Sequence, residues 1–205
     1  MDLSTGADGG LGARLRLDLA LRRSRGPQAD RSVEQWTAAL VLGDDDGMDP
    51  EILGHAAIVR CVLGLPEMAE MLDGEDAGLG TAAAAVLDPC TGEPALPLQK
   101  SLLGQGDRFL VLDSVEFEPG WRRRGIGRWF AAEALAALAP GAMFAAAIAA
   151  PMDDTEGLER KRAEAKLRRV WADLGFEPLS RGVMVLDLGT ATRGEKIAVF
   201  RTMFD

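Results

Sequence analysis

The stretch FLVLDSVEFEPGWRRRGIGRWF, residues 109–130, decides the fold. It begins as an apolar run typical of a buried strand and passes through Pro119-Gly120. It then continues as Arg122-x-x-Gly125-x-Gly127 into a segment rich in Ala and Leu, which favours a helix. A strand, a glycine loop and a helix in this order present unpaired backbone N–H groups at the helix N-terminus. Such a site binds anions, and pyrophosphate is the ligand that we expect.

The composition is that of one globular domain. At 205 residues, with 47% hydrophobic and 27% charged residues, the chain is long enough to bury a sizeable core. We expect a disordered leader over residues 1–10 and a single domain over 11–205, with a helical and loop insertion at about 65–106. The sequence shows no signal peptide, no bilayer-spanning apolar run and only two cysteines. These features favour a cytoplasmic protein without a metal and without membrane partners.

Acidic and basic side chains are unevenly distributed along the chain. The net charge of −9 argues against a general affinity for nucleic acid. Residues 41–120 hold 16 carboxylates and three basic side chains, whereas residues 121–205 hold 14 basic and 11 acidic ones. This distribution suits an anionic cofactor in the basic part and a cationic second substrate. The alternative is that the acidic loops only keep the protein soluble.

Hydrophobic periodicity predicts a mixed α/β sheet with helices on its faces. Alternation over 13–21 predicts a strand, and the apolar runs at 35–42 and 52–63 predict a hairpin. Glycines divide the helical spacing at 66–87 into two short helices. The other expected elements are strands at 108–117, 143–150, 176–179 and 183–188, helices at 124–138 and 158–174, a loop over 88–106 and a further strand near 197–200.

Two common phosphate-binding motifs do not fit the glycine loop. A Walker A loop requires a lysine followed by Ser or Thr, and the loop contains no lysine. A dinucleotide-binding fingerprint requires a third glycine three residues after Gly127, where Phe130 stands. It also requires an acidic residue about 20 positions further on, in a region that is rich in alanine here. Neither motif therefore explains the loop.

A third motif fits. The pattern Phe117-x-Pro-x-x-Arg122-x-x-Gly125-x-Gly127 resembles the acetyl-CoA signature of the GNAT superfamily of N-acetyltransferases. Downstream, VWADLGF at 170–176 resembles the Leu-Tyr-x-x-x-Gly-Phe ending of that family. The resemblance implies a GNAT-like mixed, mostly antiparallel sheet, with a V-shaped splay between strands 109–117 and 143–150 and helices on both faces. It also implies acetyl-CoA, or another acyl-CoA, as the cofactor.

The same resemblance implies which residues bind the cofactor. Backbone groups of Val115, Glu116 and Phe117 would pair with its pantetheine arm like an added strand. The loop residues expected around the pyrophosphate are Arg122, Arg123, Arg124, Gly125, Ile126, Gly127 and Arg128. Successive residues face different ways, so backbone N–H groups are expected to contribute most of the binding, with one or two arginines assisting.

Acetyl transfer to an amine requires a base that removes a proton from the ammonium group. Asp113 and Glu116 lie on the strand that would carry the thioester and are the candidate bases. Strand alternation places these two on opposite faces unless a bulge intervenes. His55, the only histidine, is a further candidate. The tyrosine that serves as acid in many family members is missing, because the chain has no tyrosine and Trp171 occupies that position.

The resemblance implies an N-acetyltransferase that transfers an acetyl group from acetyl-CoA by direct attack of an amine on the thioester. The acceptor would be an amine of a small molecule or a protein, and the acidic segment favours a cationic one. The missing tyrosine leaves a second hypothesis open, namely a non-catalytic or weakly active acyl-CoA-binding regulatory protein. A third treats the 65–105 segment as a dimerisation or partner-binding element, which makes a homodimer a candidate assembly.

Overall fold

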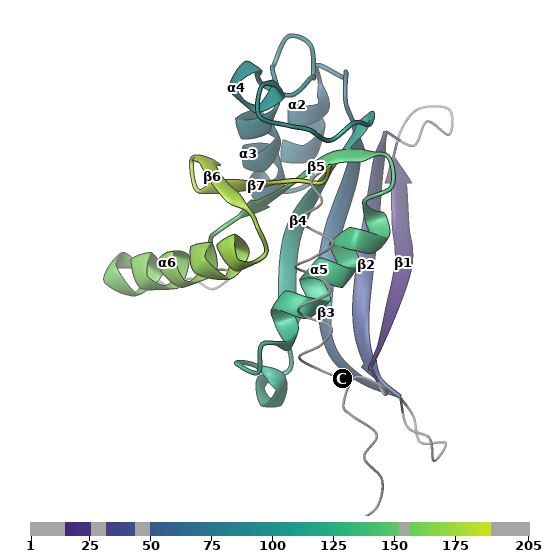
Figure 1. The fold of residues 1–205 in the computed structure, drawn as a ribbon, viewed down its shortest axis with the longest axis vertical. Coiled ribbons are helices and arrows are strands. Elements are labelled where there is room, and N and C mark those ends of the chain that lie inside the picture. The colour runs from purple at the N-terminus through teal and green to yellow at the C-terminus, as the bar shows by residue number, and fades with distance from the viewer. Residues whose placement is uncertain (1–14, 26–31, 44–49, 152–155, 190–205) are drawn as a thin grey trace, which may run out of the picture.

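In the computed structural model, the described residues form a seven-stranded sheet flanked by helices (Figure 1). The structure describes residues 15–25, 32–43, 50–151 and 156–189. The leader expected over 1–10 and the strand expected near 197–200 lie outside these residues.

The strands run in the order β1-β2-β3-β4-β5-β7-β6 across the sheet. All described neighbours pair antiparallel except β4 and β5, which are parallel. The mixed, mostly antiparallel sheet that the sequence predicted is therefore confirmed. The strands are β1 (Leu15–Arg25), β2 (Val33–Leu42), β3 (Glu51–Val62), β4 (Arg108–Phe117), β5 (Ala142–Ile148), β6 (Glu177–Ser180) and β7 (Val183–Asp187).

All four predicted helices are present, and the described residues form one more. The helices are α2 (Met68–Asp73), α3 (Ala77–Val86), α4 (Leu96–Gln99), α5 (Ile126–Leu138) and α6 (Gly157–Asp173). The helix α4 was not predicted, because its four residues lie in a Pro- and Gly-rich segment expected to be a loop. Its proline lies in the first turn, where the missing N–H breaks no helical hydrogen bond. The helix α5 begins two residues later than expected, after a 3-10 turn (η2) at Pro119–Trp121.

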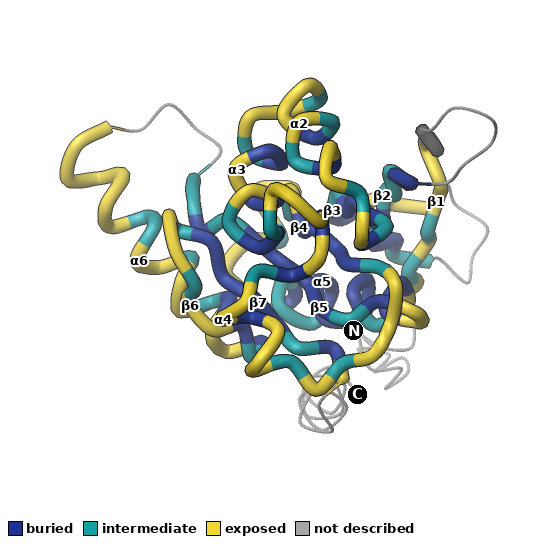
Figure 2. Tube along the Cα trace, turned by 90° about the horizontal axis from the view of Figure 1, so that it is seen from above, coloured by how far each residue is buried: buried dark blue, intermediate teal, exposed yellow. Residues whose placement is uncertain are grey.

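Helices cover both faces of the sheet, as expected. Strand alternation sends Leu110 and Leu112 of β4 to one face, where they pack in a cluster with α5 and the end of α6. It sends Phe109 and Val111 to the other face, where α2 and α3 cover them. The buried residues accordingly concentrate along the central strands, between these two layers (Figure 2).

The helix α6 is less buried than its periodicity predicted. Within the helix only Trp171 is buried, and the residues from Gly157 to Arg162 are exposed (Figure 2). The helix thus extends from the body and contacts it mainly near its C-terminal end (Figure 1). Gly175 follows with φ of +98°, the left-handed conformation that ends many helices and favours glycine.

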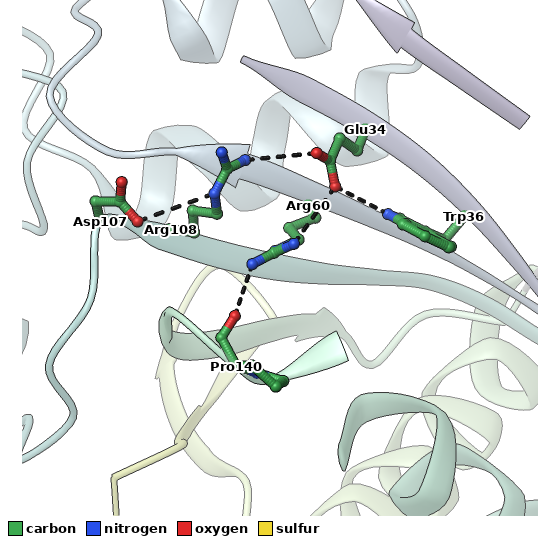
Figure 3. Close-up of polar contacts among 6 residues, drawn as sticks. All are labelled: Glu34, Trp36, Arg60, Asp107, Arg108 and Pro140. Carbon is green, nitrogen blue, oxygen red and sulfur yellow. Dashed lines mark hydrogen bonds and ion pairs between the residues drawn. The ribbon is translucent and has the colours of Figure 1, made fainter. Parts of the chain in front are cut away.

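A buried carboxylate ties β2 to its neighbours (Figure 3). Glu34 is only 5% exposed and accepts a hydrogen bond from the indole N–H of Trp36 at 3.2 Å. Its two oxygens lie 3.5 Å from Arg60 Nη1 and 3.8 Å from Arg108 Nη1. Arg60 also donates to the carbonyl of Pro140 at 2.6 Å. Two guanidinium groups therefore compensate the one buried negative charge.

Candidate functional site

The strands β4 and β5 pair over only part of the length of β4. Their parallel pairing runs from Arg108, opposite Ala142, to Leu112, opposite Ala147. Beyond Leu112, β4 continues to Phe117, while β5 ends at Ile148. In the described part of the chain, the second half of β4 therefore has no strand beside it on the β5 side. The pairing stops where the sequence predicted the splay.

The backbone of β4 directs hydrogen-bonding groups toward this open side. The N–H of Glu118 donates to the carbonyl of Leu53 on β3 at 3.0 Å. Alternate residues of a strand direct their N–H and C=O groups to opposite sides, so those of Val115 and Phe117 point away from β3. The Phe117 carbonyl accepts a hydrogen bond from Arg122 Nε at 2.7 Å. The groups of Val115 and the N–H of Phe117 are thus positioned for an extended ligand.

The glycine loop forms an uncapped N-terminus of α5. Gly125 is the N-cap residue, with φ of +82° and no side-chain hydrogen bond capping the helix. Glycine adopts this left-handed conformation without the steric cost that a Cβ brings. Ile126 and Gly127 follow as the first helical residues, so their N–H groups have no acceptor within the helix. These N–H groups and the helix dipole suit a negatively charged ligand.

Close packing brings the loop and the open half of β4 together. A Cβ on Gly127 would lie 3.4 Å from the ring of Phe117. That ring in turn packs edge-on against Phe130 of α5, with centroids 5.6 Å apart. The free backbone groups at the end of β4 and the helix N-terminus therefore belong to one continuous surface.

The side chains of the four arginines in the loop have different surroundings. Arg122 is bound to the Phe117 carbonyl, and the guanidinium carbon of Arg124 lies 5.0 Å from the ring centroid of Trp121. Arg128 Nη1 donates to Asp173 at 2.6 Å and links α5 to α6. Arg123 is exposed and has φ of +65°, a conformation unusual for a residue with a side chain.

A β-bulge in β4 occurs at Asp113. In the pairing of β3 with β4, Ile58 lies opposite Leu112 and Ala57 lies opposite Ser114. Asp113 is therefore an extra residue without a partner in the register, as in a bulge.

The bulge brings the two candidate bases to the same face of the sheet. Leu112, before the bulge, and Val115 and Phe117, after it, all pack in the cluster beneath α5. Asp113 and Glu116 alternate with these residues and so face the opposite side, where α2 and α3 lie. Regular alternation would have separated them, and the extra residue removes that separation.

The surroundings of Asp113 perturb its ionisation. Asp113 is exposed as a residue, but partial burial of its carboxyl raises the pKa of this group, and the nearby charge of Asp76 raises it further. Asp76 is the N-cap of α3 and accepts hydrogen bonds from the N–H groups of Gly78 at 2.6 Å and Leu79 at 3.3 Å. The N-terminus of α3 therefore lies beside the bulge. A carboxylate with a raised pKa accepts a proton more readily than an ordinary aspartate does.

His55 lies directly opposite Glu116 in the pairing of β3 with β4. Both side chains are exposed, and directly paired residues share one face of a sheet. The neighbouring Gly54 allows this approach, because a Cβ there would stand 2.5 Å from the Glu116 carbonyl oxygen. Sequence reasoning considered His55 alone, since nothing in the sequence shows which residue of a distant strand lies opposite it.

Trp171, the residue that the sequence resemblance aligns with the family's tyrosine, is 8% exposed. Its ring lies 6.0 Å from that of Phe176, and its indole N–H has no acceptor among the described residues. An indole N–H donates hydrogen bonds but does not ionise in the physiological range. Trp171 therefore packs against Phe176, and its side chain has no group that ionises in the physiological range.

Metal-binding and membrane-spanning features are both missing from the described residues. No group of three or more His, Cys, Asp and Glu side chains there could hold a metal ion. No described helix is long and apolar enough to cross a membrane.

Comparison with known proteins gives similarities only among solved structures. No protein-family model matches the chain, and no curated protein matches it. A mutant of KacT is 13% identical with a TM-score of 0.44, covering 87% of this chain and 98% of that one. AtaT complexed with acetyl-methionyl-tRNAfMet has the same identity and TM-score, covering 90% and 99%. A Drosophila melanogaster polyamine N-acetyltransferase is 14% identical with a TM-score of 0.40, covering 88% of each chain. Similarities this low do not identify an activity or a partner.

Proposed function

We propose that the protein is an acetyl-CoA-dependent N-acetyltransferase of the GNAT type, acting on a cationic amine. The observation that carries the proposal is the position of the uncapped N-terminus of α5 beside the open half of β4. One element offers N–H groups to a pyrophosphate, and the other offers backbone groups to an amide-containing arm. Together with the Arg-x-x-Gly-x-Gly pattern, these features suit the pyrophosphate and the adjoining pantetheine arm of coenzyme A.

The residues of the site fit this cofactor. When bound, acetyl-CoA supplies an activated thioester carbonyl. The N–H groups of Ile126 and Gly127 would hold the pyrophosphate, and exposed Arg123 would add positive charge. Val115 and Phe117 would orient the pantetheine arm along β4. Arg128 contributes less directly in this proposal, because Asp173 holds its guanidinium group.

The amine would bind at the face of the sheet on which Asp113 and Glu116 lie. Asp76, Asp113 and Glu116 make this region negative, which attracts an ammonium group. Asp113 is the proposed base, because its raised pKa lets it accept the ammonium proton more readily than an ordinary aspartate. The leaving thiolate would take its proton from solvent, since a free thiol has a pKa of about 8.5.

Cofactor binding is tested by titration calorimetry of acetyl-CoA into the full chain. Substituting Gly127→Leu places a side chain against Phe117 and over the helix N-terminus, and should weaken binding at least tenfold. The matched control is Gly120→Leu, where a Cβ would meet no atom within 4 Å. Equal affinity in wild type and Gly127→Leu would contradict the assignment of the loop.

The alternative is a non-catalytic acyl-CoA-binding protein, which the absence of any tyrosine favours. Release of free CoA, measured with a thiol reagent in the presence of mono-, di- and polyamines, separates the two. The enzyme should release CoA in a saturable, amine-dependent manner. Acetyl-CoA binding without amine-dependent release would support the alternative instead.

A further inference from the structure

The outer edge of the sheet is formed by β1, an eleven-residue strand without proline (Figure 1). No described strand lies beyond it. A long strand at an edge leaves every second residue with unpaired N–H and C=O groups, which can pair with another chain. A register shift between Leu21 and Arg23 interrupts its pairing with β2, so the regular part of β1 ends near Leu21.

The side chains of β1 divide between the two faces of the sheet. Leu15, Leu17 and Leu19 are half-buried and pack against the cluster beneath α5. Arg16 and Asp18 lie on the other face and bond to each other, with Arg16 Nε 2.8 Å from Asp18 Oδ1. A second bond joins Arg16 Nη2 to Asp18 Oδ2 at 2.9 Å.

This order of residues is self-complementary. If a second copy of β1 lies antiparallel with Leu17 opposite the partner subunit's Leu17, then Arg16 stands opposite the partner subunit's Asp18, and the converse pair forms as well. Leu15 then stands opposite the partner subunit's Leu19. The two-fold axis is perpendicular to the sheet, so the apolar faces of both subunits stay on one side.

The neighbouring registers are unfavourable. A shift toward the N-terminus that preserves the faces places Arg16 opposite the partner's Arg16. A shift toward the C-terminus places Asp18 opposite the partner's Asp18. Like charges directly opposite each other destabilise a sheet, and a shift by one residue would exchange the apolar and polar faces. Charge therefore favours the register centred on Leu17 over these two neighbouring registers.

From this complementarity we propose that the protein forms a homodimer through antiparallel pairing of β1 with β1 of a second copy, centred on Leu17. The two seven-stranded sheets then continue into one. In this dimer each Arg16 bonds to the partner subunit's Asp18, either in place of Asp18 of its own chain or together with it. The proposal does not depend on the acetyltransferase activity.

The test is a charge exchange, read by sedimentation velocity of the full chain. Wild type should be a dimer at micromolar concentration. Arg16→Asp and Asp18→Arg each place like charges opposite each other, and each should raise the dimer dissociation constant at least tenfold. An equimolar mixture of the two variants should dimerise again, because the two aspartates of one chain face the two arginines of the other. The double variant R16D/D18R should also dimerise.

These outcomes distinguish pairing between chains from the bond within one strand. Each single variant breaks the Arg16–Asp18 bond within its own chain, and mixing cannot restore that bond. The exposed pair contributes little to the stability of a single chain, so both variants should keep the far-UV circular dichroism spectrum of wild type. Arg160→Glu, which breaks another exposed pair, should leave the dimer unchanged. A monomeric wild type, dimeric single variants, or a mixture that stays monomeric would each overturn the proposal.

Discussion

Partial burial raises the pKa of Asp113 in the bulge of β4, and the charge of Asp76 at the N-terminus of α3 raises it further. The two residues come from separate elements, and only the packing of α3 beside β4 makes their charges interact. The relationship links the helical segment between β3 and β4 to the proposed chemistry, because it adjusts the group that we propose as the base.

Substituting Asp76→Asn should move the pH profile of acetyl transfer. Removing the negative charge lowers the raised pKa of Asp113, so the acidic limb of kcat/KM should shift to lower pH. Asparagine caps helices about as well as aspartate, so α3 should remain capped. Asp73→Asn, at the end of α2, is the control and should leave the profile in place. An unshifted limb in Asp76→Asn would exclude Asp113 as the base.

Substituting Asp113→Asn should stabilise the fold at neutral pH while reducing activity. Because the pKa of Asp113 is raised in the folded protein, folding disfavours its ionised form. Its favourable contribution is complete below the ordinary pKa of about 3.9 and is lost as the pH rises through the raised value. Thermal melting should therefore show a higher Tm for the variant at pH 7 and no difference at about pH 3. A lower Tm at pH 7 would contradict this account of its environment.

Substituting Gly54→Ala should destabilise the protein by about 2 kcal/mol, because overpacking costs of this size are typical. The new Cβ would lie 2.5 Å from the Glu116 carbonyl oxygen and 2.8 Å from the Phe117 ring. The end of β4 must shift to relieve these contacts, so acetyl-CoA affinity should fall as well. Urea unfolding and calorimetry measure the two effects, with Gly120→Ala as the control that changes neither.

Substituting Trp171→Phe should leave kcat within about twofold of wild type, a change of only about 0.4 kcal/mol. The indole N–H has no acceptor among the described residues, so its removal breaks no described hydrogen bond. A loss of tenfold or more in CoA release, with an unchanged melting curve, would assign Trp171 a part in the reaction that its buried position does not predict.

Substituting Glu34→Ala should cost about 3 kcal/mol of stability, because it leaves Arg60 and Arg108 without their buried counter-charge. Glu164→Ala removes the partner of Arg160 on the surface of α6 and should cost less than about 0.5 kcal/mol. Urea unfolding of both variants measures the contrast, and similar costs would contradict the structural role of Glu34.

Local patterns were sufficient to predict the strand and helix order around the glycine loop. The apolar run at 108–117 matches β4, and the alternation beginning at 13 corresponds to β1. These patterns, like the conformation of Gly125, depend on residues that are close by in the sequence. The start of α5 shifted by two residues because the 3-10 turn and Arg123 extend the loop.

The parts that could not be predicted depend on contacts between distant segments. The bulge at Asp113 is defined by its register against β3, and the pairing of His55 with Glu116 depends on the same register. The periodicity of α6 predicted a buried face, yet most of the helix is exposed, because the body extends beneath only its last turns. Residue pattern indicates a preferred face but not how much of the sheet lies beneath it.

Deuterium exchange of backbone amides, with and without acetyl-CoA, tests the central claim most directly. The proposed site predicts slower exchange in peptides that cover Val115 to Phe117 and Gly125 to Gly127, because bound cofactor would protect these N–H groups from water. The edge strand β1 should exchange at the same rate in both states. Unchanged exchange at these two segments under saturating acetyl-CoA, or protection confined to another part of the chain, would contradict the site.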